Sequence, residues 1–154
     1  MAIAWRKEMA VDGGAIDDDH RTLIDIVNEF GATDFTVTGL ELLHTILDEL
    51  DEYTKIHFAR EEQLQAAVLY PYRDAHHHEH QELIHRLASI RNMLGAASIG
   101  NSAARQVQVE MSALLHDWLV EHIIKSDLRM APYAGAMAND ASNLGPIRNC
   151  ALKL

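Results

Sequence analysis

Histidine is the residue type whose placement could do chemistry in this chain, because it occurs ten times in 154 residues. Imidazole nitrogens bind transition metals and exchange protons near neutral pH. Two pairs stand four residues apart, His57 with Glu61 and His76 with His80. Side chains at that spacing share one face of an α-helix, so each pair could bind a metal ion from one side.

These side chains fall within stripes of apolar residues that recur every three or four positions. Such a period predicts amphipathic helices with an apolar face directed at a core. A single histidine in a stripe is ordinarily a hydrogen-bonded core residue. Several polar side chains are too many for a small core unless they share a partner, and a metal ion fits them. They are His20, His57, Glu61, His76, His80 and His122.

The stripes predict helices at about 17–31, 38–69, 71–95 and 101–131. The second is expected to open on a capping box formed by Thr38 and Glu41, and the fourth to stop before Pro132. Short connections make neighbouring helices antiparallel, so we expect an all-α fold, an up-down-up-down antiparallel four-helix bundle. Because helix direction alternates, the polar members of all the stripes fall at one end of this bundle.

We expect two parts along the chain, a bundle domain at 1–131 and a C-terminal tail at 132–154. The domain begins with an irregular N-terminal arm, whose Trp5 and Val11 can pack on the bundle together with Ile16. The tail is rich in Pro, Gly, Asn and Ala. It also carries apolar side chains with which it could dock, namely Ile147, Leu152 and Leu154.

Composition excludes several classes of partner. The chain has 13 Lys plus Arg and 23 Asp plus Glu, a net charge of −10, which argues against nucleic acid and anionic membranes. A single cysteine, Cys150, cannot form an intrachain disulfide and indicates a reducing compartment. No apolar run approaches the roughly 18 residues of a membrane span, and no secretory signal is evident. We therefore expect a soluble, cytoplasmic protein, and we expect a monomer.

Asp127 stands five residues after His122, and this spacing leaves two interpretations open. Five residues of an ideal α-helix turn by roughly 140°, so both side chains cannot point at the bundle axis. Either the last turn is loosened or contains a π-bulge and Asp127 is a ligand, or Asp127 is a surface charge. The other histidines lie outside the apolar stripes and are expected at the surface; they are His44, His77, His78, His85 and His116.

The set of motifs resembles the hemerythrin family, and in particular the single-domain bacteriohemerythrins. The resemblance covers about residues 5–131. It rests on a lone histidine and three spaced pairs in a fixed order, with a Tyr-Pro break between the second and third helices. In this sequence they are His20, His57-x-x-x-Glu61, Tyr70-Pro71, His76-x-x-x-His80 and His122-x-x-x-x-Asp127.

The resemblance implies a non-haem di-iron centre with an oxo or hydroxo bridge and O₂ as its ligand. It also makes Asp127 a metal ligand. The open coordination position would lie on the iron held by His20 and His57, and Leu119 would form the apolar wall of the O₂ pocket, with Ile24, Phe58 and Ile123 as the next candidates. The implied ligands are His76, His80 and His122 on one iron, His20 and His57 on the other, and Glu61 and Asp127 bridging both.

The function implied is reversible O₂ binding for transport, storage or delivery, without enzymatic activity. The recipient of the oxygen would be an oxygen-consuming enzyme. The alternatives are an O₂ or redox sensor that uses the same centre, an iron store, and a ferritin-like oxidase. An oxidase of that type would use Glu41 with His44 and Glu82 with His85, and both pairs lie on polar rows.

The chain departs from the family pattern in two places. Asp19 stands where the bacterial members usually have glutamine, and the tail at 132–154 lies outside the shared domain. Neither departure is expected to touch a metal ligand, although the tail could alter access to the site.

Overall fold

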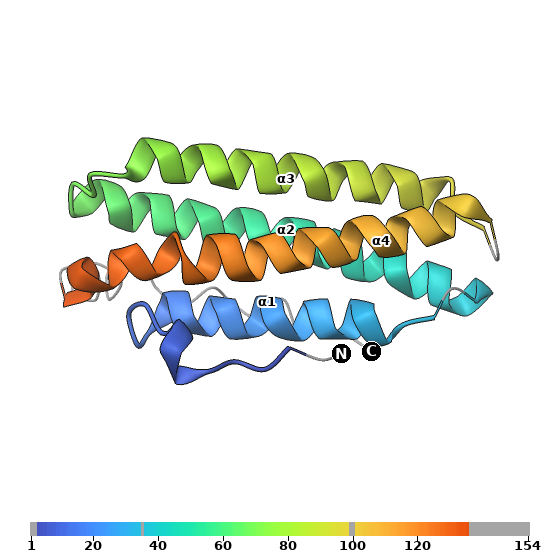
Figure 1. The fold of residues 1–154 in the computed structure, drawn as a ribbon, viewed down its shortest axis with the longest axis horizontal. Helices are drawn as coiled ribbons and strands as arrows, with labels where there is room; N and C mark the ends of the chain where they lie inside the picture. The colour runs from blue at the N-terminus through green and yellow to red at the C-terminus, as the bar shows by residue number, and fades with distance from the viewer. Residues whose placement is uncertain (1–2, 35, 99–100, 136–154) are drawn as a thin grey trace.

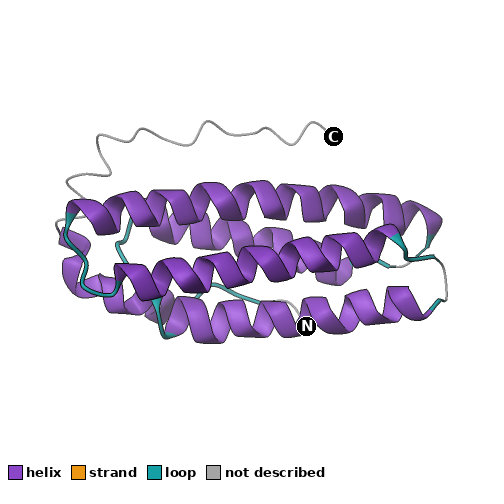
Figure 2. Cartoon of the chain, turned by 90° about the horizontal axis from the view of Figure 1, so that it is seen from above, coloured by secondary structure: helices purple, strands orange, loops and turns teal. Residues whose placement is uncertain are grey.

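Four antiparallel α-helices form the body of the protein (Figure 1). The computed structural model describes residues 3–34, 36–98 and 101–135, and of residues 37, 38, 119 and 120 it describes the backbone only. Each helix packs against the next in the chain, which confirms the predicted up-down-up-down bundle. Figure 2 shows that short loops join the helices. The helices are α1 (Ala15–Ala32), α2 (Val37–Ala67), α3 (Arg73–Gly95) and α4 (Ser102–His116).

The start of α2 differs from the predicted capping box. Thr36, and not Thr38, is the N-cap, and its hydroxyl accepts a 3.1 Å hydrogen bond from the backbone N–H of Gly39. The Thr36 hydroxyl in turn donates to the carboxylate of Asp34 at 2.6 Å. A Cβ on Gly39 would collide with the backbone carbonyl of Asp34, so this tight entry into the helix requires glycine.

The last helix leaves α-helical geometry after His116. The chain continues as a π-helix, η2 (Asp117–Ile124), and then as a 3₁₀ helix, η3 (Asp127–Tyr133). The fourth α-helix ends before Pro132, as predicted, but it ends much earlier than expected, and the separate 3₁₀ helix η3 includes that proline. The π-helical turns provide the loosening that the spacing of His122 and Asp127 requires.

Two clusters of buried apolar side chains lie on either side of the polar layer. The larger one fills the bundle with residues from all the helices, among them Leu23, Leu47, Leu87 and Met111. The smaller one, here called the end-cap cluster, is drawn from the N-terminal arm, α1, α2, the α2–α3 turn and η3. Its buried members are Val11, Ile16, Leu64, Tyr70 and Met130.

The N-terminal arm lies along α1, as expected. Asn28 of α1 holds it by two hydrogen bonds to the backbone of Ile3, at 2.7 and 2.8 Å. Trp5 packs against the larger apolar cluster, and Val11 joins the end-cap cluster. A short 3₁₀ turn, η1 (Lys7–Met9), lies between them.

Among the described residues, no helix has both the length and the apolar character needed to cross a membrane. Most of the predicted tail, residues 136–154, lies outside the described residues. Its docking through Ile147, Leu152 and Leu154 therefore stays a prediction, as does the domain boundary at residue 131.

Candidate metal centre

The seven side chains singled out in the sequence lie in one layer. This layer is at the end of the bundle where α1 and α3 begin, and Figure 1 shows the starts of these two helices. All of them are buried, with at most 3% of any residue exposed. Five different helical segments therefore bring these side chains together. They are His20 of α1, His57 and Glu61 of α2, His76 and His80 of α3, His122 of η2 and Asp127 of η3.

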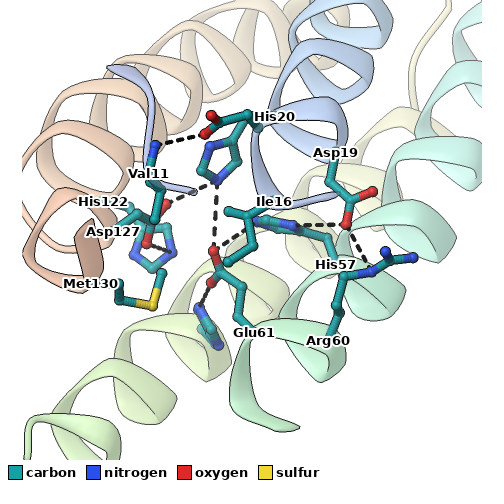
Figure 3. Close-up of polar contacts among 12 residues, drawn as sticks. Val11, Ile16, Asp19, His20, His57, Arg60, Glu61, His122, Asp127 and Met130 are labelled. Atoms are coloured by element: carbon teal, nitrogen blue, oxygen red, sulfur yellow. Dashed lines mark hydrogen bonds and ion pairs between the residues drawn. The ribbon is translucent and has the colours of Figure 1, made fainter. Parts of the chain in front are cut away.

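The ligand atoms form two overlapping groups, in each of which they lie within 4.8 Å of one another. Glu61 and Asp127 belong to both groups. Asp127 approaches Nε2 of His20 at 3.1 Å (Figure 3). Asp127 also lies 3.1 Å from Nε2 of His76, and Glu61 lies 3.2 Å from Nε2 of His80. The two carboxylates thus stand between two sets of imidazoles. The groups are Glu61, His76, His80, His122 and Asp127, and His20, His57, Glu61 and Asp127.

Most of these ligand atoms have no hydrogen-bond partner. Among the described residues, 13 buried side-chain nitrogen and oxygen atoms lack a partner, and ten of them belong to these seven residues. They include Nε2 of every imidazole and both oxygens of Glu61 and Asp127. Buried polar atoms are almost always paired, so convergent unpaired donors need an occupant that bonds to all of them. Nitrogen and carboxylate donors suit transition metal cations, including iron.

The two buried carboxylates of the layer, Glu61 and Asp127, also favour positive charge close to them. Burial would lower the pKa of His76, but the adjacent Asp127 and Glu61 outweigh burial and raise it to about 10. Asp127 raises the pKa of His20 against burial in the same way. Burial would raise the pKa of Glu61, but His57 and its other imidazole neighbours hold it well below its ordinary value. In the metal-free layer the proton on His76 offsets part of the carboxylate charge, and a bound cation would take its place.

The π-helix explains how Asp127 reaches the layer. Nε2 of His122 lies 3.3 Å from Oδ1 of Asp127, although the two residues are five positions apart. Hydrogen bonds between residues i and i+5 in η2 widen the turns, so the end of this helix does not follow the α-helical period. Of the two interpretations left open by spacing, the structure supports the buried position and not the surface charge. That the seven residues bind iron stays a prediction.

Two glutamates outside the layer contact the outer nitrogens of its imidazoles. Nδ1 of His80 lies 2.8 Å from Glu62, and Nδ1 of His122 lies 3.1 Å from Glu79. The contact with His122 lowers the pKa of Glu79 to about 2. The helical period did not indicate either glutamate, because it places both beside the inward stripe. The available signal was that each directly neighbours a candidate ligand in the sequence, Glu61 or His80.

Asp19 makes a third contact of this kind, with Nδ1 of His57 at 3.4 Å (Figure 3). The expectation that this departure from the family pattern touches no ligand is therefore wrong for Asp19. The Asp19 carboxylate is turned toward α2, where it also meets Arg60 at 3.3 Å.

Phe58 is an aromatic neighbour of several candidate ligands. Its ring stacks on that of His80, with the centroids 3.7 Å apart and an angle of 6° between the planes. Its ring and that of His122 meet in a T-shaped arrangement, with the centroids 5.5 Å apart. Phe58 was one of the reserve candidates for the pocket wall, and Ile24 and Ile123 are buried as well. The side chain of Leu119 lies outside the described part of the structure, so its assignment to the wall stays a prediction.

The remaining histidines are exposed, as the sequence predicts; they are His44, His77, His78, His85 and His116. The ferritin-like alternative would need Glu41 with His44 and Glu82 with His85 in the interior. All four of these residues are exposed on the bundle surface. The structure therefore offers no support for a ferritin-like site at these positions.

Comparisons with known proteins agree with this geometry. Residues 14–134 match the sequence model of a family described as "Hemerythrin HHE cation binding domain". The chain is 28% identical to a bacteriohemerythrin of Stenotrophomonas maltophilia over 89% of its own length and 84% of the relative's. It is 30% identical to one of Methylococcus capsulatus over 84% and 93%, and 29% identical to one of Clostridium acetobutylicum over 80% and 94%.

Proposed function

This chain belongs to the hemerythrin family, and from that premise we propose that it binds O₂ reversibly at a non-haem di-iron centre. Its role would be to carry, store or deliver oxygen to an oxygen-consuming enzyme, without catalysing a reaction itself. The observation that carries the proposal is the set of unpaired donor atoms that five imidazoles and two carboxylates direct at one another.

The two groups of ligand atoms define which residues would hold each iron. A pair of bound ferrous ions would supply the reversible O₂ binding that no protein side chain offers. Glu61 and Asp127 belong to both groups and would bridge the ions. The other ligands divide as three on one ion and two on its partner, namely His76, His80 and His122, and His20 and His57.

The donor set favours binding over oxidation chemistry. As metal ligands, its five imidazoles are neutral and only Glu61 and Asp127 are anionic, whereas four-helix oxidases of the ferritin type use four glutamates. Fewer anionic ligands give less support to iron in high oxidation states. The apolar clusters on both sides of the layer exclude water, which limits the supply of protons to the site.

Metal analysis and an optical spectrum test the proposal together. We expect two irons per chain, and a charge-transfer band that appears in air, disappears on removal of O₂ and returns on re-aeration. One zinc per chain without iron would overturn the di-iron assignment. An irreversible spectral change in air would overturn the carrier role and favour a sensor or an oxidase that uses the same residues.

A further inference from the structure

Asp19 is a buried carboxylate that neither the spacing of the ligands nor the comparisons assign to the site. It lies in α1, directly before His20, and only 4% of the residue is exposed. All of its described side-chain partners come from α2. The Tyr53 hydroxyl donates to Oδ1 at 3.1 Å, and Arg60 Nε and His57 Nδ1 lie 3.3 and 3.4 Å from Oδ2.

The contact with His57 fixes which nitrogen of that imidazole carries the proton. A carboxylate can only accept hydrogen bonds, so Nδ1 of His57 must be the donor toward Asp19. A neutral imidazole then has its lone pair on Nε2. That nitrogen faces Glu61 at 3.5 Å and has no hydrogen-bond partner. With Asp19 in this position, His57 has the tautomer that can bind a metal ion through Nε2, the nitrogen that faces the layer.

The surroundings of Asp19 hold it in place. Tyr53, His57 and Arg60 follow one another at steps of four and three residues, so they form one face of α2. The guanidinium of Arg60 compensates the charge of the buried carboxylate. Glu62 and Glu79 make the same kind of contact from more exposed positions, with 29% and 41% of their side chains accessible. Asp19 is the one of the three that is enclosed in the protein.

We propose that Asp19 is a positioning residue of the metal centre, which orients the His57 imidazole, fixes its tautomer and strengthens it as a ligand. The inference rests on the proposed metal-binding function, because it concerns the metal affinity of the position that His57 would help to form. Carboxylates that accept a hydrogen bond from a metal-bound imidazole change metal affinity by roughly 10–100-fold in known sites.

Two variants test whether the Asp19 carboxylate acts on one metal position. Asp19→Asn keeps an oxygen that can accept the hydrogen bond but removes the charge, and Asp19→Ala removes the acceptor as well. Metal-free protein is titrated with Co²⁺ alone, whose absorption bands report each bound ion. We expect two ions per chain in the wild type, and in both variants a loss of roughly 10–100-fold in affinity for one of them. Asp18→Asn is the matched control, since Asp18 is the neighbouring carboxylate, 74% exposed and paired with Arg21.

Nitrogen-15 NMR of the metal-free histidines provides a signature that a merely structural role would not change. We expect His57 protonated on Nδ1 in the wild type and shifted toward Nε2 in Asp19→Ala, with helical content retained by circular dichroism. If Asp19→Ala does not fold, Asp19→Asn carries the affinity test by itself. Unchanged Co²⁺ affinity in Asp19→Asn, or an unchanged tautomer in a folded Asp19→Ala, would overturn the inference. A wild-type protein that binds no metal would instead overturn the proposed function.

Discussion

Individual residues of the layer show that protons and metal ions compete for the same atoms. His76 has a pKa of about 10 because Asp127 and Glu61 outweigh its burial. Its proton therefore stabilises the metal-free fold fully below the ordinary pKa of 6.5, and this contribution is lost as the pH rises through about 10. A metal ion that binds Nε2 of His76 must displace this proton.

Proton release on metal loading follows from that competition. At pH 8 we expect metal binding to release at least one proton per chain, because His76 is still protonated in the metal-free protein. Calorimetric titration with a divalent metal in buffers of different ionisation enthalpy measures this number. Binding without proton release at pH 8 would show that His76 is neutral before the metal arrives.

The exposed histidines give a second prediction at this scale. His44 and His85 point to solvent, outside the layer of buried ligands. Replacing both with alanine should leave iron content and the optical spectrum unchanged. Loss of iron from this double variant would contradict the assignment of the inward faces and would revive the ferritin-like site.

Phe58 provides a third prediction, because its buried ring contacts the rings of both His80 and His122. We expect Phe58→Ala to lower the free energy of unfolding of the metal-free protein by about 3–5 kcal/mol, as truncation of a buried aromatic residue typically does. Denaturant unfolding measures the loss. Ile56→Ala is the control, since Ile56 is 37% exposed on the same helix. Equal losses in both variants would show that Phe58 is not part of the packed core.

At the scale of helices, the sequence predicted the buried side chains that follow the local helical period. It did not predict those whose burial depends on contact with another helix. Ile16, His20 and Leu23 share a face because α-helical geometry repeats over short distances, and all are buried as expected. Asp19 lies beside that stripe, and its burial depends on Tyr53 and Arg60 of another helix. No local pattern contains that information.

The last helix shows a second limit of local pattern. Spacing alone could not decide the position of Asp127, because an ideal α-helix turns it away from His122. The resemblance to a known family suggested the answer, and the π-helical turns of η2 show how the backbone achieves it. Which turns of a helix widen depends on packing, and the sequence of η2 carries no distinctive mark of it.

The end of α2 gives a prediction of its own. Leu69 follows this helix with a φ of 52°, a left-handed conformation that favours glycine, and its side chain is 87% exposed. We expect Leu69→Gly to raise the free energy of unfolding by up to about 1 kcal/mol, because strain is removed and no packing is lost. Leu42→Gly, at a 42% exposed position inside α2, should lower it by about 1 kcal/mol. A destabilised Leu69→Gly would show that the leucine side chain makes a contact that compensates the strain.

For the whole molecule, the unpaired polar layer makes stability depend on metal. The metal-free protein leaves buried donors and acceptors without partners, which is unfavourable. We expect metal to raise the free energy of unfolding by about 2.7 kcal/mol when free metal is 100-fold above its dissociation constant. Denaturant unfolding with and without a chelator tests this. In Glu61→Gln, which alters a shared ligand, metal should raise the free energy of unfolding by less than in the wild type. Equal free energies of unfolding for the wild type with metal and without it would contradict a metal role for the layer.

The order of the seven side chains along the chain has a consequence for biosynthesis. A growing chain that has left the ribosome only as far as Gly95 carries the ligands of α1, α2 and α3, but neither His122 nor Asp127. Asp127, one of the two carboxylates common to both groups, is the last to emerge. A metal ion can meet its full set of ligands only when nearly the whole described chain has been synthesised. Complete coordination of a metal ion therefore cannot precede the synthesis of Asp127, and the first helices must pack without it.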